Sequence, residues 1–189
     1  MLQLISTQII MIGQDIATII QTYDGEQEIQ PNQGFQDSQL QADMVSVGWS
    51  VGEAWCAFLG ILGWTKAYTP YPDTLAWAQR LFSGNSQQMA RNFHADPIWP
   101  TSTTTPQIGA LCIWGDGDST LTGHTGTVIA VDDDGIHFTT EEGNTIPDGN
   151  PGNEREGYIV ATHTHVIGAP HTDTGLNFIR FVIPVEPAS

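Results

Sequence analysis

The architecture can be inferred outward from one segment, Trp49-Ser50-Val51-Gly52-Glu53-Ala54-Trp55-Cys56-Ala57-Phe58. The stretch 50–52 breaks any preceding regular structure, because glycine favours turns. Beyond it, apolar residues recur at helical spacing, which predicts a helix that begins near residue 54 or 55 and turns its apolar face inward. Cys56 therefore falls in the first turn of a predicted helix.

A cysteine at a helix start has a distinctive chemistry. The first N–H groups of a helix have no partner within it, and the helix dipole places partial positive charge there. Both effects stabilise a thiolate and lower the pKa of the thiol. The N–H of Cys56 is also a natural donor to an oxyanion. We favour a nucleophile at Cys56 over a buried structural cysteine.

The partners of such a nucleophile are present downstream. His124 lies between small residues in Gly123-His124-Thr125-Gly126, just before a predicted strand. Glu142 and Asn144 are two residues apart in Glu141-Glu142-Gly143-Asn144, so we expect them to share one strand face. Either side chain accepts the imidazole N–H, and we favour Glu142 as the orienting group with Asn144 as support, while Glu141 faces away.

These residues and their order resemble a known family. Trp55-Cys56-Ala57, a glycine-flanked His124 and Glu142-Gly143-Asn144 are similar to the cysteine, histidine-dependent amidohydrolase/peptidase (CHAP) domain, as found in phages and Bacteroidetes-type genomes. The resemblance covers residues 25–183 and departs from the family at Ala110, where Asp usually follows Gly. It implies a papain-like fold, with N-terminal helices packed on a C-terminal antiparallel sheet, and catalytic roles for Cys56, His124, Glu142 and Asn144.

The resemblance also implies an activity. We expect a cysteine amidase or peptidase that acts on bacterial cell-wall peptidoglycan, as an N-acetylmuramoyl-alanine amidase or an endopeptidase. Two alternatives remain, namely a non-catalytic phage particle or wall-binding protein of the same fold, and a protein deamidase or acyltransferase that uses the same thiol. Trp49, Trp55 and Trp77 are candidates for a substrate groove, although such residues are more often core.

The composition of the chain argues against several classes of binding partner. The 5 basic and 21 acidic residues give a net charge of −16, which argues against nucleic acid and against anionic membrane surfaces. There is no apolar run long enough for a membrane span. The two cysteines, Cys56 and Cys112, are too few for a disulfide framework, and Cys112 lies in an apolar predicted strand. We therefore expect both thiols to be reduced.

The chain reads as one α+β domain over residues 1–189, with a helical part (1–95), a Pro/Thr-rich linker (96–107) and a sheet part (108–184). The apolar N-terminus carries no Lys or Arg, so we expect a helix over 4–22 rather than a signal peptide. We expect a monomer that is cytoplasmic until released, or phage-associated, and that acts on the cell wall.

We expect no cofactor and no metal. The spacing of His163 and His165 invites a zinc site, but two histidines do not complete one, and we expect both to be surface residues. Asp132-Asp133-Asp134-Gly135 is typical of a hairpin turn, and Asp116-Gly117-Asp118 of a loop, although calcium binding is the alternative for each.

Overall fold

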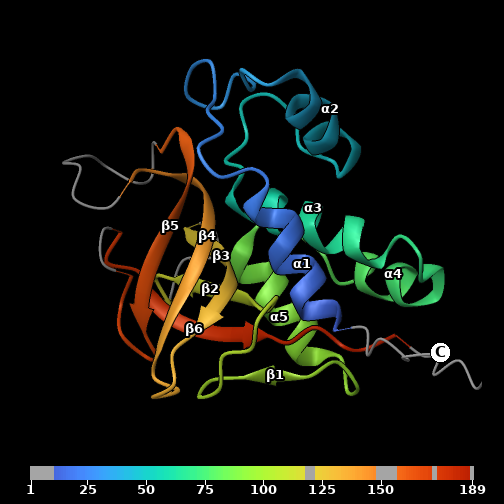
Figure 1. The fold of residues 1–189 in the computed structure, drawn as a ribbon, viewed down its shortest axis with the longest axis vertical. Helices are drawn as coiled ribbons and strands as arrows, with labels where there is room; N and C mark the ends of the chain where they lie inside the picture. The colour runs from blue at the N-terminus through green and yellow to red at the C-terminus, as the bar shows by residue number, and fades with distance from the viewer. Residues whose placement is uncertain (1–10, 118–121, 148–156, 172–173, 188–189) are drawn as a thin grey trace, which may run out of the picture.

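The computed structural model describes residues 11–117, 122–147, 157–171 and 174–187. These residues form five helices followed by six strands (Figure 1). The helices are α1 (Ile12–Gln21), α2 (Ser38–Ser46), α3 (Cys56–Tyr68), α4 (Pro72–Gln79) and α5 (Ser86–Ala95). The strands are β1 (Thr101–Ser102), β2 (Leu111–Gly115), β3 (Gly123–Val131), β4 (His137–Thr145), β5 (Ile159–Val166) and β6 (Asn177–Val182). The predicted α+β order is confirmed.

The six strands form one antiparallel sheet in the order β1-β6-β2-β3-β4-β5. Helices α1 and α3 lie together against one face (Figure 1). Gly60 of α3 allows this close approach, since an added Cβ would lie 2.8 Å from the Leu111 side chain on β2. Helix α3 is buried on nearly all sides, which explains its almost continuous apolar sequence.

The opposite face of the sheet carries a second core, in which Phe138 of β4 packs on Phe181 of β6 with ring centroids 5.1 Å apart. Strands β2 and β3 lie between these two strands in the sheet. The rings meet only because the sheet curves around this face. The curvature encloses a concave interior, and polar side chains of β3, β4 and β5 line one part of it.

The segments predicted as a linker and as a first helix can be compared with the structure. The predicted linker contains β1, which pairs with β6, and the buried Trp99, whose indole N–H donates to the carbonyl of Ile183. That segment is therefore part of the fold. Residues 1–10 lie outside the described residues, so only the α1 part of the predicted 4–22 helix can be compared; it is helical, with Ile12, Ile16 and Ile20 buried.

Two further predictions concern thiols and turns. Cys56 and Cys112 are both free thiols, as expected, and both are buried. The segment 132–135 is a hairpin turn between β3 and β4, in which the N–H of Gly135 donates to the carbonyl of Asp132. Asp134 accepts the N–H groups of Ile136 and His137. Asp116 accepts a hydrogen bond from Gln87, whereas Asp118 lies outside the described residues.

Candidate active site

Cys56 is the first residue of α3, as the sequence predicts, and Trp55 is its N-cap. Among the described residues no side chain caps this helix end, which leaves its first N–H groups available. The thiol is buried next to Ser86, the first residue of α5, with Sγ and Oγ 3.9 Å apart. The hydroxyl of Thr125 donates to that same Ser86 oxygen at 2.7 Å, which leaves the Ser86 proton free to point at the sulfur.

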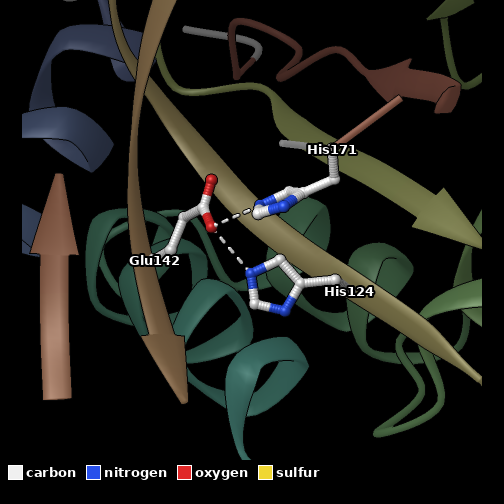
Figure 2. Close-up of side chains that lie close together, drawn as sticks. All are labelled: His124, Glu142 and His171. Atoms are coloured by element: carbon white, nitrogen blue, oxygen red, sulfur yellow. Dashed lines mark hydrogen bonds and ion pairs between the residues drawn. The ribbon is translucent and has the colours of Figure 1, made fainter. Parts of the chain in front are cut away.

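His124 lies in β3, beside the end of β2, and contacts Cys56 on one side and Glu142 on the other. Its Nε2 lies 2.7 Å from Oε2 of Glu142 in β4 (Figure 2). A carboxylate oxygen only accepts, so Nε2 carries a proton and Nδ1 is the nitrogen left for the thiol. The structure thus brings together three of the four residues expected at the site, in the order thiol, imidazole, carboxylate.

The electrostatics of Cys56, His124 and Glu142 favour an ion pair between the thiol and the imidazole. Burial alone would raise the pKa of the Cys56 thiol, but the charge and hydrogen bond of His124, with smaller contributions from Thr125 and Ser86, lower it below its usual value. Burial would likewise lower the pKa of His124, and the charges of Glu142 and Cys56 raise it well above its usual value. Both shifts favour a thiolate beside an imidazolium over a neutral thiol beside a neutral imidazole.

Glu142 is fully buried and accepts hydrogen bonds from residues beyond His124. Burial would raise its pKa, but the charge of His124 and hydrogen bonds from three histidines hold it well below its usual value. Gly126 makes room for the carboxylate, because an added Cβ there would lie 2.9 Å from Cγ of Glu142. Glu142 is thus an ionised carboxylate that stabilises the His124 imidazolium.

Asn144 does not complete the expected set. The register shifts between Glu142 and Thr145, and Asn144 has a φ of 57°, so the alternation that would place Glu142 and Asn144 on one face is interrupted. Within the part of the chain that the structure describes, the side-chain oxygen of Asn144 has no hydrogen-bond partner. It is Thr145 whose hydroxyl reaches a histidine, His163, at 3.0 Å.

Trp49, Trp55 and Trp77 do not line the cavity next to the thiol. Trp49 and Trp55 are buried in the core between α2, α3 and the sheet, and Trp77 packs on Trp99. The cavity beside Cys56, of about 430 Å³, has other walls. It is lined by Glu53, Ala54, Cys56, Phe58, Gly84, Asn85, Ser86 and Gly123. These positions do not place the three indoles in a groove at the thiol.

The expectation that His163 and His165 lie on the surface is wrong, since their exposed fractions are 2% and 6%, and His171 is likewise buried, with an exposed fraction of 1%. The alternate spacing of His163 and His165 does place both on one face of β5, but the curvature of the sheet buries that face. His171 follows β5 and is held by its backbone, whose N–H donates to Leu176 while its carbonyl accepts from Gly175. Nothing in the sequence pointed to Ser86 or His171.

One group of side chains has the composition of a metal site. One ligand atom each from His124, Glu142 and His171 lies within 4.8 Å of the other two (Figure 2). These residue types suit zinc. An ion here would take Nε2 of His124, the nitrogen that now donates to Glu142. The short nitrogen–oxygen distances are those of direct hydrogen bonds between the side chains.

Comparisons with known proteins place this geometry in context. A search of curated proteins finds no match. Among solved structures, the crystal structure of Ly7917 is similar with a TM-score of 0.49 and 15% identity, over 93% of this chain and 63% of that chain. This chain therefore spans less than two thirds of that structure.

The CHAP domain model matches residues 43–144, more than half of the chain and the part that holds Cys56, His124 and Glu142. The five helices and the antiparallel sheet agree with the papain-like fold expected from the resemblance. The chain therefore belongs to the CHAP domain family, whose members are in general cysteine- and histidine-dependent amidases or peptidases.

Proposed function

We propose that this protein is a peptidoglycan hydrolase that cleaves an amide bond by acylation of Cys56, as an N-acetylmuramoyl-alanine amidase or an endopeptidase. The observation that carries the proposal is the line from Cys56 through His124 to Glu142, with 2.7 Å between His124 and Glu142, next to a cavity that reaches the thiol. Membership of the CHAP family supports peptidoglycan as the substrate class.

The chemistry follows from the protonation states. The Cys56 thiolate attacks the carbonyl carbon of the scissile amide, and the carbonyl oxygen becomes an oxyanion. The N–H of Cys56, free at the start of α3, is a donor for that oxyanion. The His124 imidazolium gives its Nδ1 proton to the leaving nitrogen, so an amine departs and a thioester remains.

Neutral His124 then takes a proton from water. The resulting hydroxide attacks the thioester carbonyl, the carbon–sulfur bond breaks, and a carboxylic acid leaves while the thiolate and imidazolium are restored. Glu142 accepts the N–H of His124 throughout, so it stabilises the cationic ring in each cycle. Glu142 itself does not need to change its protonation.

Product analysis tests the proposal. Purified peptidoglycan is incubated with the parent protein, with Cys56→Ala and with Cys112→Ala, and the soluble fragments are identified by mass spectrometry. We expect new amine and carboxylate ends from the parent and from Cys112→Ala, and none from Cys56→Ala. Fragments that match a glycosidic cleavage, or equal release by Cys56→Ala, would refute the proposal. Transfer of the acyl group to a protein amine would instead indicate an acyltransferase.

A further inference from the structure

The orienting carboxylate is held by more partners than a thiol–imidazole–carboxylate line requires. Oε2 of Glu142 accepts from His124 and, at 3.0 Å, from Nε2 of His171. Oε1 accepts at 2.8 Å from Nε2 of His165 and also from the hydroxyl of Thr140. A carboxylate has about four lone-pair sites, so both oxygens are saturated.

These donors come from separate parts of the chain. His124 lies in β3, Thr140 in β4 and His165 in β5, while His171 belongs to the connection between β5 and β6. Figure 2 shows His124 and His171 reaching the same oxygen of Glu142. Because the carboxylate is bonded from several directions, it cannot rotate without breaking at least two hydrogen bonds in a buried setting.

We propose that His165 and His171 are positioning residues, which donate Nε2–H to the two oxygens of Glu142 and so hold the carboxylate in the place and charge state that orient His124 toward Cys56.

The physical basis of the proposal is that His124 and Glu142 compete for one proton. A buried imidazolium–carboxylate pair can collapse to a neutral imidazole and a protonated carboxyl group, since burial disfavours both charges. Each further N–H that Glu142 accepts stabilises its ionised form and keeps the proton on His124. Burial lowers the pKa of His171 despite its contact with Glu142, so this ring donates without adding a second positive charge.

Other titratable groups also face Glu142 and set the background of the pH dependence. The pKa of Cys112 in β2 is raised, by burial first and then by the charge of Glu142. The groups that act on the carboxylate directly are Cys112 from β2, His124 from β3, His165 from β5 and His171 from the following connection. Glu141 acts only through its charge, from the other face of β4. The ring of His163 lies beyond these histidines, with its centroid 6.3 Å from that of His165 and 6.1 Å from that of His171.

The test measures Cys56 directly and needs no substrate. The rate of Cys56 alkylation by iodoacetamide is followed against pH by peptide mass spectrometry in the parent, His171→Leu and His171→Gln, and in the same pair at His165. Glutamine keeps an N–H close to the position of Nε2, whereas leucine removes it. The burial-matched control is His163→Leu, because Nε2 of His163 lies 3.0 Å from the hydroxyl of Thr145.

We expect each leucine variant to move the acid limb of the alkylation profile upward by about one pH unit, since Glu142 then protonates more easily. The rate at pH 6 should fall about tenfold, the fold-change for one hydrogen bond to a charged group. Glutamine should restore most of the rate, and His163→Leu should lower only the thermal unfolding temperature. If the leucine variants do not fold, His171→Asn and His165→Asn replace them, because the side-chain N–H of asparagine is too short to reach Glu142.

Three results would overturn the inference. These are parent-like profiles in both leucine variants, an equal shift in His163→Leu, and loss of Cys56 reactivity on chelation with recovery on adding zinc, which would make the histidines metal ligands. The inference rests on the site of the proposed function but not on its substrate. If the expected alkylation pattern appears in a protein that leaves peptidoglycan intact, the positioning role stands and the proposed function fails.

Discussion

Glu141 and Glu142 are adjacent on β4 but lie in different surroundings. Replacing Glu141 by glutamine tests whether the protonation of Glu141 makes the stability of the protein depend on pH. Glu141 is buried on the α3 side of the sheet, where its neighbour across the strands is Thr127 of β3. Burial first, and then the charges of Asp24 and Glu142, raise the pKa of Glu141 from 4.5 to about 8. The folded protein therefore binds a proton that the unfolded chain releases.

The sign and the size of the pH effect on the free energy of unfolding follow from the difference in bound protons between the native and unfolded states. Between pH 4.5 and pH 8 the native state holds one more proton than the unfolded state, so the free energy of unfolding falls as pH rises through this window. At about 1.4 kcal/mol per pKa unit, the decline reaches at most roughly 5 kcal/mol by pH 8. Replacing Glu141 by glutamine removes this pH-dependent loss of stability, because a neutral amide does not titrate.

Urea unfolding of the parent and Glu141→Gln at a series of pH values measures the difference. We expect the variant to gain stability relative to the parent as pH rises, by roughly 2–5 kcal/mol at pH 8, with little difference at pH 4.5. Hydrolysis should be nearly unchanged, while the matched Glu142→Gln should lower kcat and narrow the active pH range. A stability difference that does not change with pH, or that favours the parent at pH 8, would refute the reasoning.

The remaining predictions concern the site itself. His124→Ala should reduce kcat as severely as Cys56→Ala, because base and nucleophile act as one unit, and the double variant should lose little more; additive losses in steady-state kinetics would contradict this. Gly126→Ala should lower kcat with a modest change in thermal unfolding, because its Cβ displaces Glu142; unchanged kcat would show that the carboxylate tolerates displacement. Ser86→Ala should raise the pKa of Cys56, because a donor to the thiolate is lost. Alkylation at pH 6 should then slow, and an unchanged rate would remove Ser86 from the site.

The part of the site that local patterns determine was predictable. A break at 50–52 followed by helical periodicity placed Cys56 at a helix start. His124 was expected just before a strand, and the structure places it inside β3 near the start of that strand, where its side chain is buried. Glu142 could be chosen over Glu141 by strand alternation. These predictions rest on interactions within a few residues of the chain, which sequence patterns report well.

The rest depended on long-range geometry. Asn144 was expected beside Glu142, but a register shift and a left-handed backbone interrupt the alternation. His163 and His165 were expected at the surface and His171 was given no role, because nothing local reveals that the sheet curves over these residues. Ser86 reaches Cys56 from 30 residues away through the packing of α5. Such contacts are set by how elements pack together rather than by the pattern of any one of them.

The central claim is that Cys56 forms the acyl intermediate. Intact-protein and peptide mass spectrometry after acid quenching during turnover of soluble muropeptides tests this most directly. The account predicts a mass increase equal to the acyl fragment, located on the peptide that contains Cys56, absent from Cys56→Ala and unaffected by Cys112→Ala. Continued turnover by Cys56→Ala, or an acyl group located on another residue, would contradict it.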